Sequence, residues 1–158
     1  MHKVPLALAA AALAAATFAA PVQAKDDRML LDIATALGTP AGRDRFDDTV
    51  LFLWADQAYA PPVQTFDITT VEHRSFAPIR TDEETCYAAF IDALADLRDH
   101  AKQLGANAVV NIKSIYRNRE FRSDTQFECR VGYVVNNVSL EGRVVRLPEH
   151  GISTLKPR

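Results

Sequence analysis

The sequence contains few cysteines, and the motifs of several enzyme and metal-binding classes are missing from it. Only Cys86 and Cys129 occur among 158 residues, and they are too far apart to form a Cys-x-x-Cys pair for zinc binding or thiol exchange. The sequence also has no Gly-rich phosphate loop ending in Lys-Ser/Thr, no His-x-x-x-His and no Gly-x-Ser-x-Gly. We therefore expect no catalytic residues, no metal site and no cofactor.

An excess of charge of one sign is also lacking. The chain has 18 Lys and Arg against 20 Asp and Glu, a formal net charge of −2. Three arginines do cluster in "YRNREFR", namely Arg117, Arg119 and Arg122, but Glu120 and Asp124 interrupt them. Nucleic-acid binding requires a clustered basic surface, so we interpret this segment as a solvated turn and expect no nucleic-acid partner.

The first 24 residues have the layout of a secretory signal peptide. Lys3 precedes an uncharged run of Ala and Leu, and the small residues Val22 and Ala24 occupy the positions required for cleavage after Ala24. The alternative is a membrane anchor, because a span requires about 20 apolar residues. Pro21 and the weak hydrophobicity of Ala favour cleavage. We expect one domain over residues 25–158, periplasmic or secreted, with no membrane anchor after cleavage.

Cys86 and Cys129 are predicted to form a disulfide. Exported proteins occupy oxidising compartments, where an even pair of cysteines favours a bridge. Cys86 falls at the edge of the apolar stripe of a predicted helix, and Cys129 alternates with Phe127 and Val131 on the apolar face of a predicted strand. The alternative, a redox-active pair, is disfavoured by their separation in sequence.

Residues 82–104 are predicted to form one long helix. Thr81 and Glu84 match a capping box at its start, and Gly105 is suited to the left-handed conformation that ends a helix. Apolar residues recur at helical spacing between these signals: Tyr87, Phe90, Ile91, Leu94, Leu97, Ala101 and Leu104.

Strands are predicted before and after this helix. β-branched and aromatic residues favour strands near residues 50–54, 63–76, 107–116, 125–131 and 137–147. Residues 29–46 read as short helical pieces, in which Thr39 caps a helix that starts at Pro40. The predicted class is α+β: an antiparallel or mixed sheet with one long helix packed on one face, plus short N-terminal helices.

The segment that joins the long helix to the next strand is interpreted as a packing hinge. Gly105 ends the helix, the small alanines allow the helix end to lie close to the sheet, and the valines begin the strand. Each residue has a packing role without a ligand: Leu104, Gly105, Ala106, Asn107, Ala108, Val109 and Val110.

Residues 89–116, "AFIDALADLRDHAKQLGANAVVNIKSIY", resemble the helix-to-strand signature of the YbjQ-type, heavy-metal-binding-like domain. RcsF-like envelope lipoproteins are a more distant variant, and the resemblance is strongest to small secreted bacterial proteins labelled "excinuclease ATPase subunit". The similar part covers about residues 81–147. The resemblance implies this fold and self-association into a homo-oligomer. Two features depart from the pattern: no lipid-attachment cysteine follows the leader, and "GTPAGRDR" lacks the lysine of an ATPase loop.

Histidines were considered as metal ligands. His73, His100 and His150 are far apart, and Asp96 and His100 share a helix face that we interpret as solvated surface.

Two other segments remain of interest. Trp54 lies in an aromatic and proline-rich corner that suits a binding surface or, more commonly, a core. In "RVGYVVNN", Gly132 is expected to mark a bulge or kink in a strand.

These features predict a non-enzymatic exported protein that acts in the cell envelope through contact with a protein partner. The alternative is a periplasmic small-ligand or metal-binding protein, and an enzyme comes third. A convergent set of ligands would indicate a metal protein, and a pocket of strongly perturbed titratable groups would indicate an enzyme.

Overall fold

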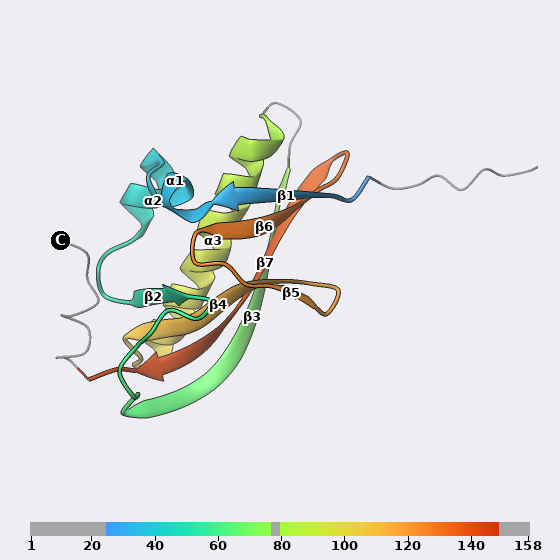
Figure 1. Cartoon of the computed structure of the whole chain (residues 1–158). Helices are drawn as coiled ribbons and strands as arrows, with labels where there is room; N and C mark the ends of the chain where they lie inside the picture. Colours follow the sequence, from blue (N-terminus) through green and yellow to red (C-terminus); the bar gives the residue numbers. More distant parts are fainter. Residues whose placement is uncertain (1–24, 77–79, 149–158) are drawn as a thin grey trace, which may run out of the picture.

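The computed structural model describes residues 25–76 and 80–148 (Figure 1). The predicted signal peptide, residues 1–24, lies outside the described residues, as do residues 77–79 and the C-terminal residues 149–158, which include His150. The helices are α1 (Ile33–Leu37), α2 (Pro40–Arg45) and α3 (Asp82–Gln103).

The described strands form one mixed sheet, so the predicted α+β class with a mixed sheet is confirmed. The sheet has seven strands. Its main path runs β1-β6-β7-β4-β2, and the two remaining strands branch from it, β3 paired to β7 and β5 paired to β4. The pair β2–β4 is parallel and the other pairs are antiparallel. The strands are β1 (Asp27–Asp32), β2 (Leu51–Trp54), β3 (Gln64–Phe76), β4 (Ala108–Tyr116), β5 (Arg119–Phe121), β6 (Gln126–Val131) and β7 (Val135–Arg146).

Strand β7 connects the parts of the sheet. Along one edge it pairs with β3 over nearly its whole length, and along the other it pairs first with β6 and then with β4. The sheet therefore forks beside β7. At the fork, the backbone N–H of Glu128 in β6 donates to the hydroxyl oxygen of Ser114 in β4 at 2.9 Å.

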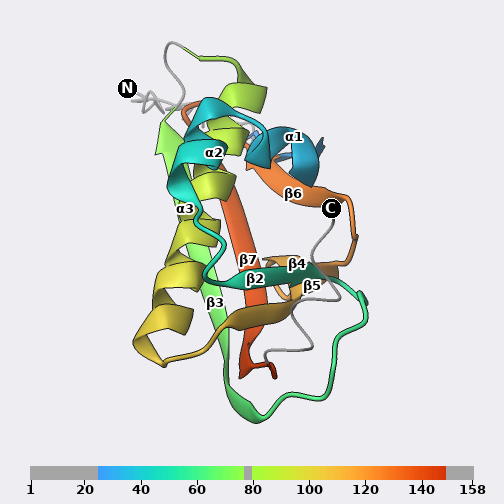
Figure 2. The ribbon, with the colours of Figure 1, turned by 90° about the vertical axis from the view of Figure 1, so that its left-hand side faces the viewer.

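Residues of α3 and of the sheet form the main core. Helix α3 lies along β3 and β7 (Figures 1 and 2). Alternate residues of β7, including Val138, Leu140 and Val144, are fully buried in the same cluster as Phe90 and Leu94 of α3. We call this the inner face of the sheet. Because side chains alternate along a strand, the intervening residues of β7 lie on the opposite, outer face.

The predicted ends of α3 are confirmed. Thr81 and Glu84 form the capping box, in which each side chain bonds the backbone N–H of the other residue. Gly105 has φ +70°, the left-handed conformation that a residue with a side chain adopts at a cost. The short helices are also confirmed, with Thr39 as the cap and Pro40 as the first residue of α2.

The interpretation of residues 29–46 as short helical pieces is wrong at their start. Met29 to Asp32 belong to β1, which pairs in continuous register with β6. Met29 and Leu31 lie opposite Cys129 and Phe127. A free antiparallel edge of β6 offers backbone partners to this segment, and that long-range pairing outweighs its local helical preference.

Two features of the C-terminal half also differ from prediction. The turn at Arg117 and Asn118 has φ +48° and +62°, which closes a two-residue hairpin and pairs the unpredicted strand β5 with β4. Gly132 does not kink a continuous strand. It follows the end of β6, and its N–H donates to the carbonyl oxygen of Val135 at 3.2 Å, so it belongs to the turn between β6 and β7.

The two cysteines join α3 to β6. Their sulfurs lie 2.02 Å apart, as predicted, and both residues are fully buried. Cys86 lies in the first turns of the helix, and Cys129 lies near the end of β6. The bridge therefore holds the start of α3 against the strand that leads into the β6–β7 turn.

Removing the disulfide is expected to destabilise the fold strongly. The two cysteines are 43 residues apart in sequence. In the chain-entropy model, closing such a loop in the unfolded chain stabilises the folded protein by about 4 kcal/mol. The double variant Cys86→Ala, Cys129→Ala should lose a free energy of unfolding of this order in urea. The native parent should resist alkylation and be modified only after reduction and unfolding. An unchanged urea midpoint in the double variant would contradict this prediction.

A second constraint joins β2 to β4 through two left-handed residues. Ala55 has φ +45° and Asn111 has φ +54°. The side-chain amide of Asn111 donates to the carbonyl oxygen of Ala55 at 3.0 Å and accepts from the hydroxyl of Tyr59 at 2.8 Å. Asn111 lies where the register of β4 shifts against β7. These bonds stabilise the bulge that an asparagine accommodates better than most residues.

Substitution at Asn111 should separate backbone strain from side-chain bonding. Asn111→Gly loses both hydrogen bonds but keeps the left-handed backbone without strain. Asn111→Ala loses the same bonds and adds the steric cost of a Cβ. Allowing for the greater unfolded-state entropy of glycine, Asn111→Ala should be less stable than Asn111→Gly by about 0.5–1 kcal/mol. Chemical denaturation of the two variants measures the difference; equal or reversed stabilities would show that φ at this position carries no cost.

Candidate functional site

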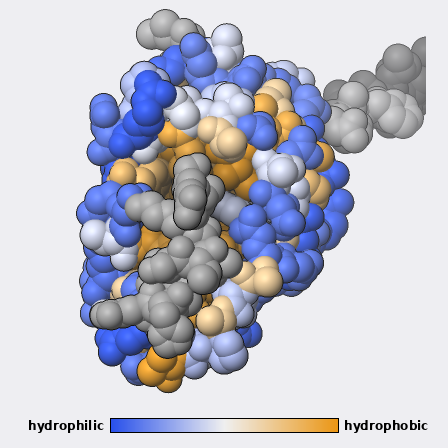
Figure 3. Space-filling view, turned by 60° about the vertical axis from the view of Figure 1, so that its left-hand side comes forward, coloured by the Kyte–Doolittle hydropathy of each residue, from blue (hydrophilic) through white to orange (hydrophobic). Residues whose placement is uncertain are grey.

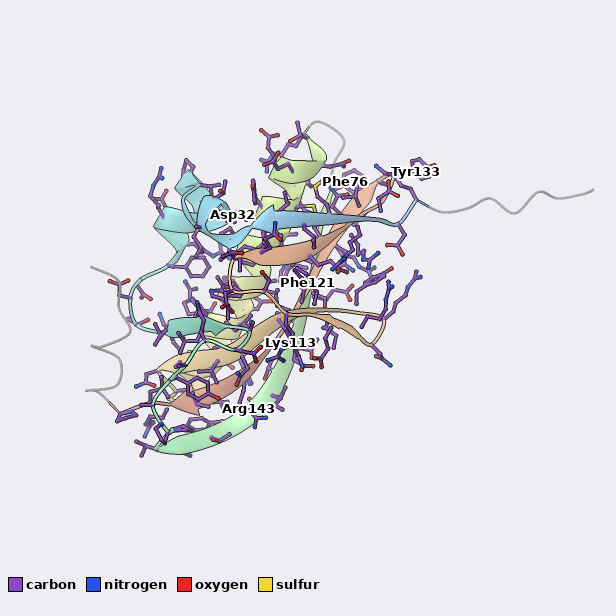
Figure 4. The ribbon with its side chains drawn as sticks, viewed as in Figure 1. Asp32, Phe76, Lys113, Phe121, Tyr133 and Arg143 are labelled. Carbon is purple, nitrogen blue, oxygen red and sulfur yellow. A yellow bond between two sulfur atoms is a disulfide. The ribbon has the colours of Figure 1, made fainter. Side chains whose placement is uncertain are left out.

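The most exposed aromatic side chains lie together at one end of the sheet. Phe76 ends β3 and lies opposite Val135, while Tyr133 and Val134 form the turn before β7. Their exposed fractions are 65% for Phe76, 80% for Tyr133 and 54% for Val134. We call these three residues the apolar tip. Figure 4 shows Phe76 and Tyr133 projecting at the same end of the molecule.

The fold explains why these side chains are exposed. Gly132 permits the tight turn, since a Cβ there would lie 2.7 Å from the carbonyl oxygen of Val135. The disulfide at Cys129 fixes the strand that leads into this turn. The tip therefore extends from a rigid base, and exposed aromatic residues on a rigid base are typical of protein contact sites.

A polar groove begins beside the tip on the outer face. Arg74 of β3, Asn137 of β7 and Arg130 of β6 occupy one row across three strands. They line a cavity of about 280 Å³ that also includes Gly132 of the tip's turn. An adjoining cavity of about 600 Å³ continues along β7 and shares Arg74 and Asn137.

Two charged side chains on the outer face, Glu128 and Lys113, are each paired with two residues of opposite charge. Glu128 is only 8% exposed and accepts from Arg28 at 2.6 Å and from Arg130 at 2.7 Å. Lys113 contacts Glu120 at 2.5 Å and Glu141 at 3.0 Å. Burial acts to lower the pKa of Lys113, but its hydrogen bonds to these two carboxylates outweigh burial and raise it.

Tyr116 lies between two guanidinium groups in the groove. Arg130 lies 4.3 Å and Arg117 4.9 Å from the ring centroid, and the hydroxyl donates to Asp26 at 2.8 Å. Burial and the hydrogen bond to Asp26 raise the pKa of the phenol. Nearby, the side-chain oxygen of Asn137 is buried and accepts no hydrogen bond from the described residues.

The predicted packing motif lies at the far end of α3 from the tip. Arg146 donates to the carbonyl oxygen of Gly105 at 3.1 Å, and Ala106 bonds back to Ala101. The amide of Asn107 bonds the backbone of Leu147 in both directions, at 2.7 and 2.9 Å. Ala108, Val109 and Val110 begin β4 and are fully buried, and Leu104 caps α3.

His73 and His100 each pair with an aspartate between α3 and β3. His100 contacts Asp67 of β3 at 2.9 Å rather than Asp96, and Asp96 contacts His73 of β3 at 2.6 Å. The helix face that was interpreted as solvated surface is therefore bridged to β3 by two half-exposed pairs. No group of three or more potential metal ligands is found among residues 25–76 and 80–148.

The cluster of three arginines is dispersed by the fold. Arg117 stacks on Tyr116 and contacts Asp26 at 3.4 Å, whereas Arg122 contacts Asp56 at 2.5 Å, just after the end of β2. Within the described part of the chain, no helix combines the length and hydropathy needed to cross a membrane.

No protein-family model matches the chain, and no curated protein shows significant sequence similarity to it.

The tip was only partly visible in the sequence. In the segment "RVGYVVNN", the sequence signal was Gly132, which predicted a bulge or kink. Tyr133 and Val134 gave no signal of their own. An apolar pair directly after a glycine in a hairpin turn is a signal for exposed hydrophobic residues. Phe76 had no such signal, because its alternation with neighbouring residues is that of an ordinary strand.

The titration of Tyr116 tests the electrostatics of the groove. Its raised pKa means that folding favours the neutral phenol, so this contribution to stability is present below pH about 10 and lost as the pH rises through the folded-state value. Burial also raises the pKa of Tyr87, so Tyr116→Phe should remove one of the two high-pH parts of the phenolate absorbance curve at 295 nm. Asp26→Asn should move that part to lower pH, because it removes the negative charge that opposes ionisation. An unchanged curve in Asp26→Asn would contradict the assignment.

Proposed function

We propose that this chain is a non-enzymatic exported protein that acts in the cell envelope by contact with another protein, and that the apolar tip makes this contact. The observation that carries the proposal is the exposure of Phe76, Tyr133 and Val134 side by side at one end of the sheet. Aromatic side chains supply much of the binding energy of protein interfaces. The buried disulfide supports export, because such bonds persist in oxidising compartments.

The charges around the tip favour a protein over other partners. Lys25 pairs with Asp82 at 3.4 Å, and Arg74 pairs with Glu72 at 2.8 Å, so both signs border the apolar residues. An apolar centre with a mixed polar rim is typical of protein interfaces. Nucleic acids and anionic membranes would favour a uniformly basic rim.

The proposal takes residues 25–158 as a single exported domain, with α3 as the long helix that covers one face of the sheet. The similarity of residues 81–147 to the YbjQ-type domain remains part of the proposal. A second copy of this chain is one form that the partner can take. A periplasmic small-ligand protein is the second candidate, and it is favoured by an apolar hollow beside β2.

Site-specific photo-crosslinking in the native host tests the contact. With a photoreactive phenylalanine analogue in place of Val134, the chain should form one predominant adduct, to be identified by mass spectrometry. Phe76→Ser with Tyr133→Ser should remove this adduct because they remove the exposed rings. Each substitution should change the free energy of unfolding by less than about 0.5 kcal/mol, since both side chains are exposed.

Val63→Ser is the matched control. Val63 is 70% exposed, as an apolar residue next to the other end of β3, far from the tip. This substitution should leave the yield of the adduct unchanged. The proposal fails if the adduct persists without the two tip rings, or if Val63→Ser reduces it equally.

A further inference from the structure

A separate apolar hollow lies between the two short helices and β2. It has a volume of about 480 Å³, within the usual range for small-molecule sites. Figure 3 shows hydrophobic surface on this side of the molecule, bordered by hydrophilic residues. The lining residues that matter here are Leu37, Arg43, Phe46, Val50, Phe52 and Trp54.

The side chains at the base of the hollow are buried, whereas those at its mouth are partly exposed. Val50 and Trp54 form the base and are 5% and 7% exposed, and Trp54 stacks on Phe90 of α3 at 5.7 Å between ring centroids. Phe46 and Phe52 meet edge to face at 5.7 Å and are half-buried. The apolar lining therefore extends from two partly exposed phenylalanine rings at the mouth to a buried indole at the base.

The rim carries one cation that lacks a carboxylate partner. Arg43 is the single basic residue among the described lining residues. It donates to the carbonyl oxygen of Gly38 and makes no ion pair within the described part of the chain. Two carboxylates share this rim, Asp47 and Asp48, and neither lacks a partner. Asp47 pairs with Lys102 at 3.0 Å, and hydrogen bonds from Thr49 and Lys102 lower its pKa to about 2.

We propose that this hollow binds the apolar chain of a small amphiphile whose single anionic head group lies beside Arg43. An acyl chain can fill an apolar hollow without hydrogen-bond partners, whereas a peptide would have to satisfy each buried N–H and C=O. Each methylene that enters the hollow strengthens binding about threefold to fourfold. The site is independent of the apolar tip and of the contact proposed for it.

The chain has one tryptophan, so its fluorescence reports on this hollow alone. We expect 12-bromododecanoate to quench the emission of Trp54 in the full chain, saturably and below its critical micelle concentration, and dodecanoate to compete with it. Shortening the competitor by two methylenes should weaken competition about tenfold. Dodecyltrimethylammonium, with the opposite head charge, should compete less well than dodecanoate.

Two variants locate the ligand. Leu37→Glu places a charge at the mouth and should abolish quenching. Arg43→Gln should weaken binding of 12-bromododecanoate about twofold to fivefold, the range of an exposed ion pair, and leave 12-bromododecanol unchanged.

Absence of saturable quenching, or equal competition by decanoate and dodecanoate, would overturn the proposal. Both measurements use the parent chain, so they decide the question even if Leu37→Glu fails to fold. Equal weakening of the acid and the alcohol by Arg43→Gln would overturn the assignment of the head group. None of these outcomes bears on crosslinking at the tip, so the two proposals fail separately.

Discussion

The pairing of β7 with three other strands is the constraint on which the rest of the structure depends. β3 occupies one edge of β7, and β6 and β4 divide the other between them. The outer groove runs along β7 and is lined by residues of β3, of the end of β4 and of β6. The same strand begins at the turn that carries the apolar tip. A change in the register of β7 by one residue would exchange its buried and exposed side chains, and would move both features.

The two faces of this sheet balance their interactions differently. The inner face buries apolar side chains against α3, and the disulfide holds the end nearest the tip. On the outer face, Glu128 and Lys113 each have two oppositely charged partners. The tip is different because its apolar side chains are largely exposed, and the hollow beside β2 is different because its lining is mainly apolar. For this reason we place binding at these two surfaces rather than in the larger polar groove.

Local signals in the sequence were sufficient for α3 and for most strands. Thr81, Glu84 and Gly105 determine the ends of the helix through bonds between neighbours in the chain, and such bonds depend little on the rest of the fold. The errors arose where distant partners decide. β1 forms because β6 offers it an edge, and β5 forms because a two-residue turn returns the chain along β4. The pairing of the histidines has the same cause. His73 of β3 pairs with an aspartate of α3, and His100 of α3 pairs with one of β3, because the tertiary fold places this helix beside this strand.

The sequence by itself determined the α+β class, the caps of the long helix and the pairing of two inward-facing cysteines, because periodicity and capping act over a few residues. The tertiary structure alone decided which apolar residues remain exposed. Phe76 and Val138 look alike as members of alternating strands, yet one is 65% exposed and the other is fully buried. The difference depends on what each residue faces across the sheet. Burial is a property of the assembled layers rather than of the strand, so the sequence pointed to segments of the two proposed surfaces but only the fold decided which of their side chains are exposed.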